Sequence, residues 1–102
     1  MRNPWTTKRG REALATIFRT EIDPQDECLN EVMARRWLAK RGVDVRLPDG
    51  ARGRGYYVYR RGGTWLLDGK RAIGWWSYCP SDYVHFSTYA AAQIAAVLAT
   101  VK

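Results

Sequence analysis

The chain has 102 residues, of which 46% are hydrophobic and 26% are charged. These values are typical of one small globular domain and argue against wholesale disorder. The net charge of +7 is concentrated, because residues 33–71 hold eleven Lys or Arg against three Asp, a net charge of +8. A positive field of this kind favours acidic partners, either nucleic acid or an acidic protein surface.

Several classes of protein are disfavoured by the composition. The chain has no run of about 18 apolar residues that would span a membrane, and its first residues lack the apolar run of a secretion signal. We therefore expect a cytoplasmic protein without a membrane partner. Cys28 and Cys79 are too few for a disulfide framework or a four-thiolate zinc site. The abundance of Arg and Ala suggests a GC-rich bacterial or phage genome.

The first half of the chain predicts two helices. Apolar residues at helical spacing predict the first over residues 7–22, with Thr6 or Thr7 as N-cap. Asp23-Pro24 predicts the start of the second, over residues 24–41, which ends at Gly42. Its expected apolar stripe consists of Leu29, Val32, Met33 and Trp37, and its last turns carry Arg35, Arg36, Lys40 and Arg41, which suit a helix C-terminus.

The second half predicts a sheet and a third helix. The segment VDVRLP fits a short extended piece, and the glycine-rich loop after it is followed by three or four antiparallel strands between residues 56 and 87. The first two strands are expected to form a hairpin around Gly62-Gly63. An Ala-rich helix over residues 88–101 follows, with Ile94, Val97, Leu98 and Val101 on its core side. The predicted fold is a small α+β domain with two N-terminal helices and one C-terminal helix.

Strand alternation assigns one sheet face to the core and the other to solvent. The core side is predicted to include Val58, Trp65 and Phe86, with Trp37 buried from the second helix. The other face and the loop before it combine aromatic rings with cations, which are typical of binding hot spots and of base-stacking surfaces. The predicted binding residues are Arg52, Arg54, Tyr57, Tyr59, Arg60, Arg61, Lys70, Arg71, Trp76 and Tyr78. The alternative is a purely structural role, in which large aromatic residues cover an open sheet.

No motif in the sequence predicts catalysis, a metal or a cofactor. The segment from Gly63 to Arg71 has the wrong glycine spacing for a phosphate loop and lies in hairpin context. Cys79, Asp82 and His85 lie close in sequence, but alternation points His85 outward and no second histidine exists. We therefore expect no enzymatic activity.

The segment from Tyr56 to the C-terminus, with its Gly-Gly hairpin, Trp65 and Phe86-Ser87-Thr88 before an Ala-rich helix, resembles the arm-type DNA-binding domain of tyrosine recombinases. This resemblance implies that the open sheet face enters a DNA groove. A second similarity, of ARRWLAKRG, LPDG and GRGYYV, is to the recognition helix and wing of phage excisionases.

Two functions remain open from the sequence. The first is a non-enzymatic nucleic-acid-binding accessory protein, DNA-binding or RNA-binding, encoded by a phage or mobile element. The alternative is a protein-binding regulator or inhibitor, such as a phage anti-defence protein of the anti-CRISPR type, whose aromatic and Arg side chains occupy a partner's acidic or nucleic-acid-binding site.

Overall fold

The computed structural model describes residues 3–18, 23–46, 57–60, 66–67, 70–71 and 86–101. Its elements, in chain order, are the short 3-10 helix η1 (Pro4–Thr6), α1 (Lys8–Ile17), α2 (Glu27–Ala39), β1 (Val43–Arg46), β2 (Tyr57–Arg60), β3 (Leu66–Leu67), β4 (Lys70–Arg71) and α3 (Tyr89–Thr100). The three α-helices and the antiparallel strands confirm the predicted α+β class.

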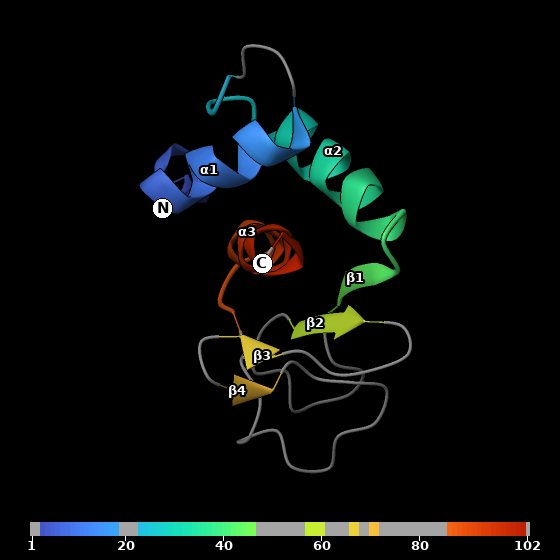
Figure 1. Cartoon of the computed structure of the whole chain (residues 1–102). Coiled ribbons are helices and arrows are strands. Elements are labelled where there is room, and N and C mark those ends of the chain that lie inside the picture. The colour runs from blue at the N-terminus through green and yellow to red at the C-terminus, as the bar shows by residue number, and fades with distance from the viewer. Residues whose placement is uncertain are drawn as a thin grey trace.

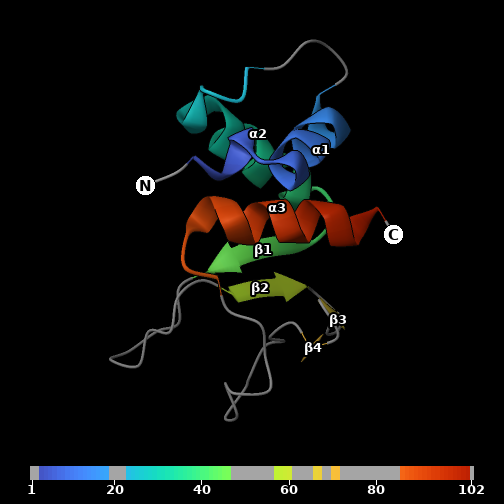
Figure 2. The same ribbon diagram turned by 90° about the vertical axis from the view of Figure 1, so that its left-hand side faces the viewer.

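Helix α3 lies between two layers, with α1 and α2 on one side and the β1–β2 pair on the other (Figures 1 and 2). Most of its residues are buried, namely Ala90, Ala92, Gln93, Ile94, Ala95, Ala96 and Val97. Alanine side chains allow close packing against neighbours on more than one side, which explains why burial extends beyond a single stripe. Ile94 and Val97 are buried as predicted, whereas Val101 is 55% exposed because α3 ends at Thr100.

Helix α1 begins where the sequence predicts and ends earlier. Thr7 is the N-cap, and its Oγ1 accepts a hydrogen bond from the Gly10 amide at 3.1 Å. The helix stops at Ile17 instead of residue 22, because Phe18 has an extended backbone and packs its ring against the core. The β-branched residues Thr16 and Ile17 have modest helix propensity, so this packing contact decides where the helix ends.

Before α1, the short helix η1 places Trp5 in the core, which the sequence pattern did not predict. Trp5 has no exposed surface and is the largest fully buried side chain among the described residues. Asn3 caps η1 by accepting from the Trp5 amide at 3.0 Å, and its own side-chain amide donates to the Pro24 carbonyl at 2.8 Å. The N-terminal segment is thus tied both to the core and to the turn before α2.

Gly10 is required where α1 lies against the backbone of η1. A Cβ atom at this position would lie 2.2 Å from the Pro4 carbonyl oxygen and 2.6 Å from the Trp5 Cα, and both of these are backbone atoms. We expect Gly10→Ala to lower the free energy of unfolding by about 1 to 3 kcal/mol, in spite of the better helix propensity of alanine. Urea denaturation measures the change. Arg9→Ala, an exposed neighbour in the same helix, is the control with an expected change within about 0.5 kcal/mol. Equal stability of the two variants would contradict the close approach.

Helix α2 starts at Glu27, three residues later than predicted, because its N-cap is Asp26 and not Asp23. The Asp26 carboxylate accepts from the Leu29 amide at 3.1 Å. Asp23 instead forms a turn, in which its carboxylate accepts from the Gln25 amide and its carbonyl accepts from the buried side chain of Asn30. Hydrogen bonds to the carbonyls of residues 23 and 24 from distant side chains favour this turn over an additional helical turn.

The predicted apolar stripe of α2 is wrong by about one residue position. The buried residues are Asn30, Ala34 and Leu38, whereas Leu29 and Val32 are 49% and 47% exposed. Asn30 can occupy the core because its amide bonds the Asp23 carbonyl. The helix therefore packs through a narrow, partly polar face and presents aliphatic side chains to solvent.

The sheet begins earlier than predicted. Strand β1 pairs with β2 in antiparallel register, with Val45 opposite Val58 and Asp44 opposite Tyr59. Val43, Val45 and Val58 are buried, as predicted for Val58, while Tyr59 alternates to the other side and is half-buried.

Strand β3 pairs with β4, so neither observed pairing is the hairpin predicted around Gly62-Gly63. A single sheet of three or four strands stays a prediction, as does the burial of Trp65, which lies outside the described residues. Phe86 and Trp37 are partly buried against the core.

Candidate functional site

The structure describes part of the predicted binding surface. Tyr59 is half-buried on the sheet side opposite Val58, and Arg60 is exposed at the strand end, in register with Val43. Alternation therefore places Arg60 on the Val58 side of the sheet and not beside Tyr59. For Tyr57, Lys70 and Arg71 the structure gives strand positions only. The remaining predicted residues lie outside the described part, namely Arg52, Arg54, Arg61, Trp76 and Tyr78.

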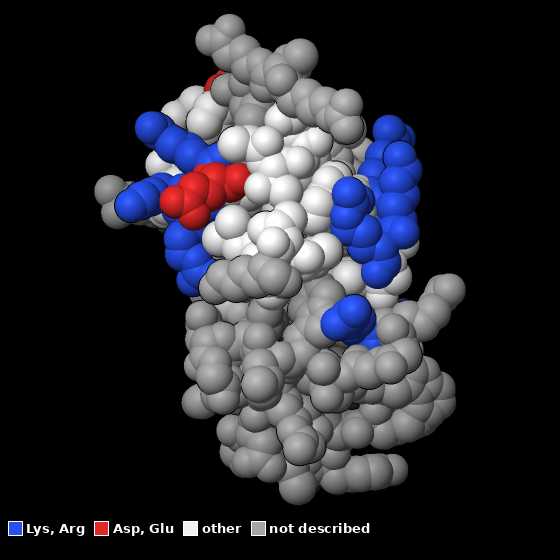
Figure 3. Space-filling model, viewed as in Figure 1, with Lys and Arg blue, Asp and Glu red and all other residues white. Residues whose placement is uncertain are grey.

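The C-terminal half of α2 and the turn after it carry a group of cations that the sequence pattern assigned only to helix stabilisation. We call it the α2 basic end, and it consists of four exposed residues, Arg35, Arg36, Lys40 and Arg41. Figure 3 shows Lys and Arg atoms gathered over this end of α2 and further Lys or Arg atoms near β2, with no Asp or Glu atoms of the described residues visible between them. Lys8, Arg9 and Arg11 are exposed residues of α1. Figure 3 shows Lys and Arg atoms over α1 on the opposite side of the view, next to acidic atoms.

The last cation of the α2 basic end is fixed in position. The Arg41 guanidinium lies 3.6 Å from the centroid of the Trp37 ring, and its Nη1 donates to the Trp37 carbonyl at 2.9 Å. Helix α2 ends at Ala39, two residues earlier than predicted, and Gly42 follows Arg41 with a φ of 74°, a left-handed conformation that leads the chain into β1. The turn therefore places Arg41 next to the start of the sheet.

A second guanidinium–aromatic contact lies on β1 and β2. Arg46 lies over the ring of Tyr59, 4.6 Å from its centroid, and its Nε donates to an Asp44 carboxylate oxygen at 2.9 Å. The Asp44 and Arg46 side chains are each about half exposed, so this ion pair adds little to stability. It does offset the charge of Arg46, which makes Arg46 a weaker attractor of anions than Arg41.

Tyr89 and Gln93 connect α2 to α3 near the basic end. Burial raises the pKa of the Tyr89 hydroxyl above its ordinary value, and the nearby Arg35 guanidinium partly offsets this rise. Tyr89 is therefore a neutral phenol at physiological pH and adds no negative charge near Arg35. The buried Gln93 side chain donates to the Glu31 carbonyl at 3.0 Å and holds the inner face of α2 against α3.

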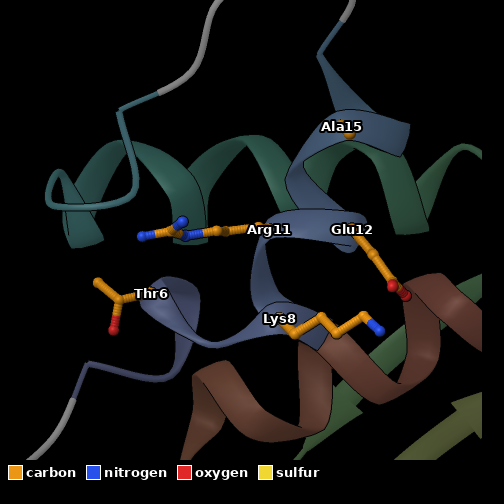
Figure 4. Close-up of a pocket in the computed structure, with 5 residues that line it drawn as sticks. All are labelled: Thr6, Lys8, Arg11, Glu12 and Ala15. Carbon is orange, nitrogen blue, oxygen red and sulfur yellow. The ribbon is translucent and has the colours of Figure 1, made fainter.

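An open hollow of about 520 Å³ lies on the outer side of η1 and α1. It is lined by Thr6, Lys8, Arg11, Glu12 and Ala15, of which all but Thr6 are exposed. Figure 4 shows Lys8 and Glu12 extending to one side of α1 and Arg11 to the other. A ligand pocket normally encloses most of its ligand and converges a few polar groups on it. Divergent, exposed side chains of mixed charge do not provide this.

The described part of the chain contains no group of three or more His, Cys, Asp or Glu placed to hold a metal ion. Cys79, Asp82 and His85 lie outside it, and Cys28 is an exposed free thiol on α2. None of the helices described here is long and apolar enough to cross a membrane.

Sequence reasoning missed the α2 basic end as a site, although two signals were present. The four cations lie within the most basic span of the chain, and Trp37 and Arg41 are four residues apart, a spacing that brings side chains together on a helical surface. Comparison with protein-family models, with curated proteins and with solved structures gave no match to this chain.

Proposed function

We propose that this chain is a non-enzymatic nucleic-acid-binding protein that contacts the phosphate backbone through the α2 basic end. The observation that carries this proposal is the group of four exposed cations at the C-terminal end of α2 and in the turn after it, with Arg41 held over Trp37. Cations that contact phosphates supply most of the affinity of sequence-independent nucleic-acid binding.

The dimensions of the basic end support a backbone contact. Residues 35 to 39 rise about 6 Å along the axis of α2, and Lys40 and Arg41 extend the basic end into the turn after it. A DNA duplex carries one negative charge per about 1.7 Å of its axis with both strands counted, so a length of this size carries about three to four phosphate charges. The helix dipole places only about half a negative charge at the same end, which is small against four cations.

Two matched variants test the proposal. Arg35→Gln, Arg36→Gln and Lys40→Gln together remove three charges from the α2 basic end, and Lys8→Gln, Arg9→Gln and Arg11→Gln remove three from α1, so each variant lowers the net charge from +7 to +4. In fluorescence-anisotropy titrations at 50 mM salt, we expect the α2 variant to bind duplex or single-stranded DNA about 100-fold more weakly than the unmodified protein. The α1 variant should lose less than about fivefold, because those cations lie on another side of the molecule.

Circular dichroism and a melting curve must first establish that both variants are folded, because cations in the last turn also favour the helix. Equal losses in the two variants would mean that only total charge matters and would contradict a site on α2. Absence of binding by the unmodified protein to DNA and RNA at 50 mM salt would exclude the proposed function itself.

A second function, that of a protein-binding regulator or inhibitor, is favoured by a different observation. Leu29 and Val32 are about half exposed on α2, next to the basic end, and together they join an apolar contact area to a cationic one. Interfaces commonly combine such an apolar centre with Arg residues. A partner that co-purifies after nuclease treatment, and that is lost on replacement of Leu29 and Val32 by Ser, would support this function over nucleic-acid binding.

A further inference from the structure

We infer that Arg41 is a preoriented phosphate ligand and that Trp37 is the residue that positions it. This inference rests on the proposed function. The inference specifies what the basic end recognises, namely the phosphodiester backbone and not the bases. It is carried by the geometry of these two side chains and by the packing of the Trp37 ring.

The Arg41 side chain is held at two points. Its guanidinium lies over the Trp37 ring at 3.6 Å, and one of its N–H groups bonds the Trp37 carbonyl. A guanidinium has five N–H donors in a rigid plane, so a single bond to a carbonyl leaves the capacity for a bidentate contact. Arg41 is exposed, which gives an anion access to it. Fixing the long side chain beforehand lowers the entropy lost when a phosphate binds.

The same packing removes Trp37 as a base-stacking surface. One side of its ring is covered by Arg41, and the side chain is partly buried against the hydrophobic core. A base could stack on Trp37 only after displacing the guanidinium. Binding at this end should therefore depend on phosphates and be nearly independent of base identity.

The contact of Arg46 with the Tyr59 ring can be compared with that of Arg41 and Trp37 in the same molecule. This guanidinium also lies over an aromatic ring, but the Asp44 carboxylate accepts its Nε–H and offsets its charge. A phosphate at Arg46 has to compete with Asp44. We therefore assign the stronger phosphate contact to Arg41.

The inference can be tested with substitutions that leave the net charge unchanged. Arg41→Lys retains the cation but loses the planar fork, and Arg36→Lys, at an exposed position in the last turn of α2, is the matched control. In titrations with a mixed-sequence 20-mer duplex, we expect Arg41→Lys to weaken binding about tenfold without changing the salt dependence, and Arg36→Lys to weaken it less than about twofold. Trp37→Leu should weaken binding as much as Arg41→Lys does, and the double variant should bind no more weakly than either single variant.

Trp37→Phe keeps an aromatic ring under the guanidinium and should retain most of the affinity, which controls for loss of packing in Trp37→Leu. Duplexes of different sequence should bind within about threefold of one another. Equal effects of Arg41→Lys and Arg36→Lys, or a strong base preference abolished in Trp37→Leu, would overturn the inference while leaving nucleic-acid binding intact. A wild-type protein that binds no oligonucleotide would overturn the proposed function instead.

Discussion

Replacing Trp5 with Ala is expected to lower the free energy of unfolding by about 3 to 5 kcal/mol. Trp5 has no exposed surface and belongs to the same core cluster as Leu14, Leu38 and Val97. Removal of this side chain loses its burial and leaves a cavity next to backbone that Gly10 holds close. A small domain has only about 5 to 15 kcal/mol of stability in total, so this one substitution should bring the protein close to unfolding at room temperature.

Urea denaturation followed by far-ultraviolet circular dichroism measures this loss. Leu29→Ala is the control, because its side chain is about half exposed and should change stability by less than about 1 kcal/mol. The indole Nε1 of Trp5 has no hydrogen-bond partner among the described residues, so the expected loss comes from packing alone. A Trp5→Ala protein as stable as the Leu29→Ala protein would show that the N-terminal segment is not part of the core.

The affinity for duplex DNA is expected to fall about two to three orders of magnitude when the salt concentration rises from 50 to 200 mM. Each phosphate contact releases condensed counterions, which gives a slope near −0.9 per contact in a plot of log affinity against log salt concentration. Four to six contacts, from the α2 basic end and its neighbours Arg46 and Arg60, produce a fall of this size. Titrations at four salt concentrations determine the slope. An affinity that changes less than about threefold over this range would contradict a phosphate-backbone contact.

The sequence predicted the three α-helices, the start of the first and both ends of the third to within one residue, because these depend on local signals. Thr7, one of the two residues expected to cap the first helix, caps α1, and Thr88 caps α3. Helix α2 ends at Ala39, before the expected stop at Gly42, which has the left-handed conformation that glycine adopts most easily. The start of α2 was misplaced because Asp23-Pro24 and Asp26 are both plausible caps. The choice between them depends on hydrogen bonds from Asn3 and Asn30, which arise only in the folded chain.

The buried residues were harder to predict, because burial also depends on contacts that arise only in the folded chain. The Ala-rich α3 has close neighbours on two sides, so a single apolar stripe could not describe its burial. On α2, the apolar pattern predicted Leu29 and Val32 as core residues, whereas the small Ala34 and the hydrogen-bonded Asn30 occupy the contact. Hydrophobicity alone does not reveal that a close contact selects small side chains.

The candidate site was predicted in its chemistry more than in its position. The sequence indicated a basic and aromatic surface, and Tyr59 alternates away from Val58 as expected. The pairing of Arg41 with Trp37 was not foreseen, because the ring was assigned to the core and the cation to the helix end. Residues four apart at a helix end lie close together, so the spacing of Trp37 and Arg41 was the signal from which the pair could have been predicted.

The salt dependence of the two charge-matched variants tests nucleic-acid binding through the α2 basic end most directly. Removing three cations from α2 should lower the magnitude of the log–log slope by about 2.7, three contacts at 0.9 each, while removing three from α1 should leave the slope within about 0.5 of the unmodified protein. Both variants have the same net charge, so a difference between them reports the location of the phosphate contacts. A slope that is unchanged in the α2 variant, or one that falls equally in both, would contradict the assignment of the binding surface to this end of α2.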